Sequence, residues 1–299
     1  MAESSVLPAT ASAALGVPPA TRRRPVRFST IAQHATIIFF CLVILIPIAW
    51  VLLLSVKSLR DAYTGALWPE QFDFTHYAYV FEHMPQALRN FANSIIVTLS
   101  TVIITSTIAI LAGYALVHLR TPGRALVVSV LVATLFFPTR LVSLIGIFQI
   151  QNSLHLINTL PGLILPYVTL NLALSILVMR GIFEQISAEM VDAAKIDGAN
   201  SWRILLEILL PLAANGLVVL VIVNFVTAWG EYLLAVTLTN DQSMRTFPVV
   251  LVTTFGGFGE WAFPRVAAMY IMAITPGIIT FAIAQRWYMK GLMEGALKI

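Results

Sequence analysis

Two aspartates and five histidines are the side chains of this sequence whose chemistry first suggests catalysis or metal binding. Asp192 and Asp197 lie five residues apart, about 140° around a helix, so they do not share a face as an acid–base pair would. The sole cysteine, Cys41, lies in an apolar run, and no Gly-Lys pair that could form a P-loop occurs. No two histidines have the i, i+4 spacing of a helical metal site: His34, His76, His83, His118 and His155. The sequence therefore predicts no enzyme, no metal site and no cofactor.

The segment 186–211 differs from every other polar stretch, and its local pattern predicts two short helices joined by a tight turn. A small polar residue can cap each helix, an acid in the first turn favours the helix dipole, and glycine can take the left-handed conformation that ends a helix. The residues that can begin or end these helices are Ser187, Glu189, Gly198, Asn200, Ser201 and Pro211.

Ala193 and Ala194 have almost no side chain, so on a helix they offer a smooth strip that the groove of another protein could approach. Asp192 and Asp197 flank that strip with negative charge. Local physics leaves two interpretations open. The helix either docks against a partner, or it is an amphipathic helix that lies in the membrane interface.

The composition requires a membrane. Of 299 residues, 59% are hydrophobic and only 11% are charged, whereas soluble domains carry about 25% charged residues. The formal net charge of +4 is small, and no basic face for nucleic acid is visible. Apolar surface on this scale is stable when it faces lipid, so we expect an all-α integral membrane protein.

Six apolar stretches are long enough to cross a bilayer as helices, which need about 20 residues. Residues 1–30 predict a disordered, basic cytoplasmic tail, and residues 31–299 a transmembrane domain. The predicted spans are 31–56, 91–118, 125–150, 160–180, 206–230 and 266–286.

Lysine and arginine placement predicts the orientation, because cytoplasmic segments carry an excess of both. With the N-terminus inside, the inner segments hold Arg22, Arg23, Arg24, Arg27, Arg120, Arg124, Arg180, Lys195, Arg203, Arg286, Lys290 and Lys298. The outer segments hold Lys57, Arg60, Arg89, Arg140, Arg245 and Arg265. This asymmetry predicts six spans with both termini in the cytoplasm. The long outer loops 57–90 and 231–265 are rich in aromatic residues, which either anchor them at the interface or form a docking face for an external partner.

Polar residues inside the predicted spans are candidates for a solute pathway. Arg140 falls in the outer half of the third span and either extends to the outer interface or acts as a gate residue, paired with Glu231. Asn93 and Asn224 offer neutral hydrogen-bonding groups that suit an uncharged polyol. The alternative role for such asparagines is contact between helices.

The order of residues in the cytoplasmic segment resembles the loop signature of ABC importer permeases. The match is Asp192-Ala-Ala-x-x-Asp197-Gly198-Ala199, with Leu210-Pro211 thirteen residues after the glycine. The family usually has Glu where this chain has Asp192, a change that keeps the charge and shortens the side chain. The resemblance implies a coupling helix that sits in a cleft of an ATPase subunit. It is carried by Asp192, Ala193, Ala194, Asp197, Gly198 and Pro211, and Glu189 lies in the same helix.

Further pieces resemble the shorter, maltose-type permease of carbohydrate-uptake systems. They are Asn93-Ser94, Gly113-Tyr-Ala-Leu116, Trp229-Gly-Glu-Tyr-Leu-Leu-Ala235, Gln285-Arg286 and Gly291-Leu-x-x-Gly-Ala-Leu-Lys298. The resemblance implies a subunit in a bacterial or archaeal cytoplasmic membrane that imports a sugar or related polyol. Its partners would be a second permease, two ATPase subunits, an external solute-binding protein and membrane lipid. The alternatives are an ABC permease for a non-sugar solute and an ion-coupled carrier, although the first four spans lack the buried acids that a carrier needs.

Overall fold

The structure is a computed structural model, and it describes residues 28–136, 142–255 and 262–296. Over these ranges the regular secondary structure is helical, apart from one isolated antiparallel bridge between Lys57 and Phe72, which confirms the all-α part of the predicted fold class. The longer helices are α1 (Phe28–Leu54), α4 (Ala87–His118), α5 (Arg124–Phe136), α7 (Leu144–Ser153), α8 (Leu160–Glu184), α12 (Ala214–Trp229) and α15 (Phe263–Ala296). The shorter ones are α2 (Leu59–Thr64), α3 (Thr75–His83), α9 (Ala188–Ile196), α10 (Ser201–Arg203), the π-helix η2 (Ile204–Leu209), α11 (Leu210–Leu212), α13 (Leu233–Leu238), the 3₁₀ helix η3 (Gln242–Met244) and α14 (Phe247–Phe255).

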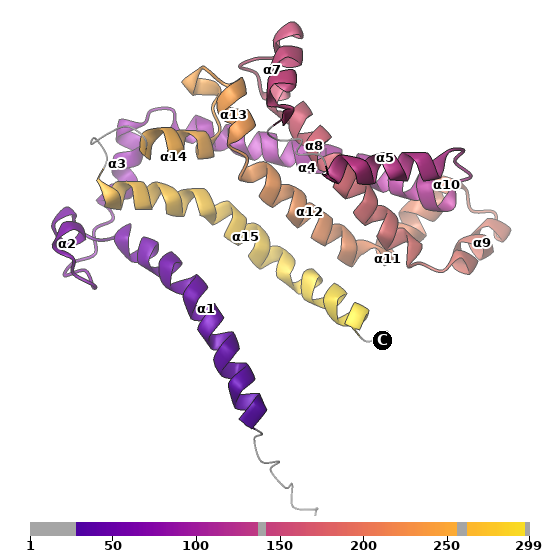
Figure 1. The fold of residues 1–299 in the computed structure, drawn as a ribbon, viewed down its shortest axis with the longest axis horizontal. Coiled ribbons are helices and arrows are strands. Elements are labelled where there is room, and N and C mark those ends of the chain that lie inside the picture. Colours follow the sequence, from indigo (N-terminus) through magenta and orange to yellow (C-terminus); the bar gives the residue numbers. More distant parts are fainter. Residues whose placement is uncertain (1–27, 137–141, 256–261, 297–299) are drawn as a thin grey trace, which may run out of the picture. The chain divides into compact units, whose positions relative to one another are not determined.

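The chain divides into two compact units, residues 1–49 and 50–299. In the first, most of α1 is apolar, and its stretch Ala32–Leu54 is long enough to cross a bilayer. In the second, α4 and α8 pack along each other, and α12 lies between this pair and α15 (Figure 1). A side chain at Gly113 of α4 would meet the Met179 Cβ atom at 3.0 Å, so the glycine allows α4 and α8 to approach closely.

Four long helices contain stretches that are apolar enough to span a membrane, and each overlaps a predicted span. These stretches are Ala32–Leu54, Ala87–His118, Leu160–Glu184 and Phe263–Arg286. Their ends differ from the predicted ends by only a few residues, because long apolar runs specify a helix clearly.

The other two predicted spans are not continuous helices. The stretch predicted as 125–150 contains α5, which packs on α8, and α7, which packs on α13; residues 137–141 between them lie outside the described residues. The stretch predicted as 206–230 bends by 80° between Leu212 and Ala214. Pro211 lies two residues before this bend, and proline removes a backbone donor that a continuous helix needs.

The segment after α1, which belongs to the predicted outer loop 57–90 and is called the outer segment below, is tied together by its own polar groups. The Asp73 amide donates to the Val56 carbonyl at 2.8 Å, and the buried His76 ring contacts the Lys57 carbonyl at 2.7 Å. The Thr75 hydroxyl and amide donate to Asp73 and lower the pKa of its carboxyl, an effect to which His76 adds. Aromatic side chains on this segment, such as Trp68, remain exposed.

Candidate functional site

The predicted hairpin is present as α9, a turn and α10. Ser187 occupies the N-cap position of α9 without a side-chain hydrogen bond, and Glu189 lies in the first turn. Gly198 has a φ of +81°, the left-handed conformation expected of a glycine that ends a helix. Asn200, not Ser201, caps the next helix, since its Oδ1 atom accepts the Arg203 amide at 2.8 Å. Local sequence signals therefore determine the hairpin almost completely.

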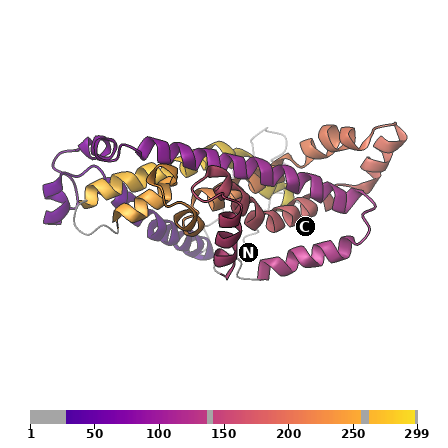
Figure 2. The ribbon, with the colours of Figure 1, turned by 90° about the horizontal axis from the view of Figure 1, so that it is seen from above.

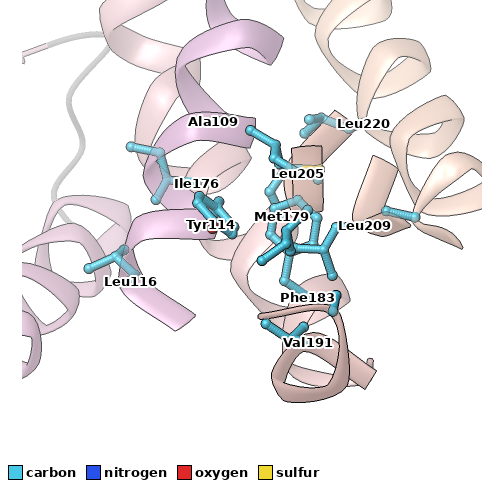
Figure 3. Packing of buried hydrophobic residues seen from close by; sticks show 13 residues of the cluster. Ala109, Tyr114, Leu116, Ile176, Met179, Phe183, Val191, Leu205, Leu209 and Leu220 are labelled. Atoms are coloured by element: carbon cyan, nitrogen blue, oxygen red, sulfur yellow. The ribbon is translucent and has the colours of Figure 1, made fainter. Parts of the chain in front are cut away.

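The inner face of α9 is held by apolar packing. Val191 is 2% exposed and joins a cluster with Phe183 of α8 and Leu205 of η2, in which Ala194 also takes part. Figure 3 shows Val191 next to Phe183, beneath the packed ends of α4, α8 and η2. Because the buried residues of this cluster come from five elements, namely α4, α8, α9, η2 and α12, a movement of α9 would act directly on the ends of long helices.

The outer face of α9 presents apolar side chains where a soluble surface would be polar. Ile196 is 86% exposed at the end of α9, and Trp202 is 62% exposed in α10. Met190 is also exposed. A hairpin that packs one face inward and leaves such side chains outside has the character of a docking surface.

The structure corrects one detail of the predicted contact strip. Ala193 is exposed, but Ala194 is buried against the helix ends together with Val191. The two alanines therefore lie on different faces. Positions 191 and 194 are one helical turn apart, so the inner face is the one that this spacing selects.

The charged side chains on the hairpin are exposed, and two pairs of them form ion pairs. Lys195 donates to the Asp192 carboxylate at 2.9 Å, and Arg203 donates to that of Glu207 at 2.8 Å. Asp197 is the C-cap of α9, and its amide donates to the Ala193 carbonyl. Exposed pairs contribute little to stability, so these charges remain available to a partner.

Beyond the hairpin the chain enters the bundle through a bend. The π-helix η2 is followed by α11, where Pro211 lies, and the 80° bend follows at Ala213. Pro211 has no amide hydrogen, which weakens the helical hydrogen bonding just before the bend. Pro211 lies two residues before Ala213, where the chain bends.

The predicted pathway residues have protein partners. The Asn93 amide group donates to the Ser243 carbonyl at 2.9 Å and the Arg245 carbonyl at 3.2 Å. Asn224 and Ser175 exchange hydrogen bonds of 3.0 and 3.2 Å between α12 and α8. Asn93 thus anchors the segment around residues 243–245, and Asn224 makes the helix–helix contact that was its alternative role.

Glu231 is a helix cap in this structure. Its carboxylate accepts the amides of Leu234 and Ala235 at 3.1 Å, at the start of α13. The anion also complements the helix dipole there. Arg140, the partner predicted for Glu231, lies outside the described residues.

Two further side chains of α4 fix the same segment: Asn90, which sequence reasoning overlooked, and Ser94, which the sequence singled out only within the pair Asn93-Ser94. Asn90, one turn before Asn93, donates to the Gln242 and Arg245 carbonyls at 2.7 and 2.9 Å, and the Ser94 hydroxyl accepts the Phe247 amide at 2.8 Å. The hydroxyl and amide side chains at 90, 93 and 94 were the available signal, but their partners lie about 150 residues away in the sequence. We call residues 242–247, with these three side chains, the outer latch.

Comparison with known families identifies the kind of protein to which this hairpin belongs. The family described as "Binding-protein-dependent transport system inner membrane component" matches residues 105–292, which is more than half of the chain and includes α9. The chain belongs to this family. It is therefore a permease subunit of an ABC importer and a multi-pass protein of the inner membrane.

Several relatives of this ABC permease are named as sugar-transport permeases. It is 34% identical to the trehalose transport system permease protein SugB of Mycobacterium tuberculosis, over 85% of this chain and 92% of that protein. It is 30% identical to the trehalose/maltose transport system permease protein MalG of Thermococcus litoralis, over 87% and 94%.

A solved structure confirms the permease fold. A chain from a bacterial ABC transporter that imports the acidic polysaccharide alginate superposes with a TM-score of 0.76 at 26% identity, covering 91% of this permease and 100% of that chain. The resemblance that the sequence indicated, to carbohydrate-uptake permeases of the maltose type, is confirmed by these relatives together.

Proposed function

We propose that this permease imports a sugar or related polyol and that α9 is the coupling helix through which a separate ATPase drives it. The single observation that carries the proposal is the division of α9 into two faces. Val191 and Ala194 join it to the ends of the long helices, while Ile196 remains almost fully exposed nearby. A helix fixed on one side and open on the other can transmit the movement of a partner as a rigid-body rotation of the bundle.

The residues carried over from the family resemblance fit this division of roles. Asp192, Ala193 and Asp197 are exposed and would contact the ATPase, and Glu189 extends the same exposed surface. Ala194 would instead fix α9 to the bundle, since it is buried. Gly198 would set the turn, and Pro211 the entry into the bundle.

The topology that suits this role has six spans and cytoplasmic termini. Four spans would be the long apolar helices, the bent pair that ends in α12 would be another, and α5 with α7 would form the remaining one. The arginine and lysine asymmetry supports this orientation, with α9 inside and the outer latch outside.

The complete transporter would contain a second permease, two ATPase subunits and an external solute-binding protein. In it, Asn93, Asn224 and Glu231 would hold the elements that line the pathway, because their polar atoms already have protein partners. The sugar assignment follows from relatives that transport trehalose and maltose. Uptake assays with these disaccharides, beside an amino acid and a phosphate ester, test it. Uptake of the amino acid or the phosphate ester, without uptake of either disaccharide, would reject the sugar assignment.

Co-purification tests the coupling surface. The variant Ile196→Asp places a charge on the proposed contact, and we expect it to retain less than a tenth of the ATPase subunit while the chain remains folded. The matched control is Leu67→Asp, an equally exposed apolar residue in the outer segment, which should retain the ATPase fully. Equal retention by both variants would reject α9 as the coupling helix.

A further inference from the structure

A basic recess lies between three helices at the same end of the molecule as α9. It has a volume of about 400 Å³ and is lined by Leu116 and Val117 of α4, Arg124 and Ser129 of α5, and Arg180 and Glu184 of α8. A second hollow of about 450 Å³ shares Val117 and Arg124 with it and includes Arg120. Leu116 also belongs to the apolar cluster that holds Val191, which places the recess near the coupling hairpin.

Positive charge in this recess is only partly compensated. Arg180 donates to one Glu184 carboxylate oxygen through Nε at 2.9 Å and Nη2 at 2.7 Å, so the sole acid among the lining residues is already engaged. Neither Arg120 nor Arg124 has a hydrogen bond or an ion pair in the part of the chain that the structure describes. Guanidinium groups with free donors are well suited to the oxygen atoms of a phosphate.

The recess opens beside an apolar surface. Helix α5 has no buried residue, and it rests on the core only through partly buried residues such as Val128 and Leu131. Its other face is apolar and exposed, with Leu126 at 70% exposure and Val130 at 53%. Figure 2 shows α5 (magenta) joined to the end of α4 by a short loop, so the arginines lie where this apolar helix begins.

We propose that this recess binds the headgroup phosphate of an anionic phospholipid. Arg120 and Arg124 would contact the phosphate, and the acyl chains would lie along the exposed face of α5. Basic pockets between helices at the cytoplasmic side of a membrane favour anionic headgroups for the same reason. An acidic protein segment would satisfy the arginines but would leave the apolar face of α5 uncovered, so the lipid fits both halves of the surface. The proposal is independent of the solute and of the role assigned to α9.

Lipid titration followed by native mass spectrometry of the full chain in neutral detergent tests the site. We expect the double variant Arg120→Gln/Arg124→Gln to bind phosphatidylglycerol roughly tenfold more weakly than the unaltered chain. The matched control is Arg60→Gln, which removes one arginine from the outer segment and should leave this affinity unchanged. Phosphatidylglycerol affinity that is the same in the double variant would overturn the proposal.

Two further variants keep the test decisive if the double variant fails to fold. Arg124→Lys preserves the charge and should retain binding within about threefold, whereas Ser129→Phe fills the recess without changing charge and should weaken binding. Strong binding by the Ser129→Phe variant would contradict the site. Displacement of the lipid by millimolar inorganic phosphate would show a free-anion site instead. Loss of a partner subunit from the double variant, with lipid binding unchanged, would assign the recess to a protein contact.

Discussion

The α9–α10 hairpin and the outer latch are short segments that contact opposite ends of α4, but they are attached by different interactions. The hairpin rests on apolar side chains, and the hydrogen bonds of its own side chains stay within residues 192–207. The latch is held by buried side chains of α4 that bond to backbone groups about 150 residues away. Apolar contacts lack the directionality of hydrogen bonds, so the hairpin can adjust its angle under load while the latch cannot.

The hairpin and the latch also differ in how far their side chains are exposed. In the hairpin, Ile196 and Trp202 are exposed. In the latch, the side chains of Asn90, Asn93 and Ser94 are almost completely buried. At the latch, the Ser243 amide donates to Asp241, and this lowers the pKa of the Asp241 carboxyl. Such local bonds stiffen the segment that contains the latch, whereas the α9–α10 hairpin leaves apolar side chains exposed.

The largest effect should come from breaking the latch. Asn90→Leu/Asn93→Leu removes four part-buried hydrogen bonds and leaves their carbonyl acceptors without these donors, at a cost of roughly 4 kcal/mol. The thermal unfolding midpoint of the purified protein should fall by several degrees. Asn152→Leu, at an exposed helical position, is the control and should change little. An unchanged midpoint in the double variant would show that the latch is not a rigid anchor.

A smaller, local effect should follow from loosening the hairpin. Val191→Ala removes two buried methyl groups and should weaken the attachment of α9 by about 2 kcal/mol. Amide hydrogen exchange across residues 188–199 should accelerate while exchange in α8 stays the same. Met190→Ala alters an exposed neighbour and should leave both rates unchanged. Acceleration in α8 as well would mean that the two elements open together.

Substitutions of Gly198, in the turn between α9 and α10, should destabilise the turn only through backbone strain. No atom lies within 4 Å of the position that a Cβ atom would take at Gly198, so steric contact is not the issue, but its φ is +81°. Gly198→Val should therefore cost about 1–2 kcal/mol, whereas Gly198→Asn, which tolerates this conformation, should cost less. Hydrogen exchange of the turn amides distinguishes them, and equal rates would contradict the assigned strain.

The smallest effect on stability should come from the exposed charges of the hairpin. Lys195→Gln breaks the ion pair between Lys195 and Asp192. Both side chains are exposed, and such pairs contribute less than about 1 kcal/mol to the free energy of unfolding. The unfolding midpoint should be unchanged. A large loss of stability would mean that the hairpin, like the latch, depends on polar bonds.

Much of the fold could be predicted because long apolar runs and local caps act through neighbouring residues. The ends of α4 and α8 and the turn at Gly198 are of this kind. The 80° bend near Pro211 could not, since the angle that a proline allows is decided by the packing on either side.

The candidate site was predictable in outline but not in orientation. The nine-residue helix α9 buries Val191 and Ala194 because they pack in one cluster with Phe183 and Leu205 of other elements. Glu231 looked like a gate acid, and its role as a cap depended on α13, a six-residue helix inside a loop that the apolar pattern did not reveal. The orientation of α9 depends on contacts with other elements, and the role of Glu231 depends on a short helix that the sequence pattern does not reveal.

Site-specific cross-linking to the ATPase tests the central claim most directly. Cys41 is the chain's one cysteine, so Cys41→Ser gives a cysteine-free background in which single cysteines can be placed at Ile196, at Ala194 and at Leu67. In the assembled transporter, Ile196→Cys should form a covalent adduct with the ATPase subunit through a short thiol-reactive linker. Ala194→Cys, which faces the bundle, and Leu67→Cys, in the outer segment, should not. Adducts of equal yield from the two faces of α9, or none from Ile196→Cys, would contradict the account.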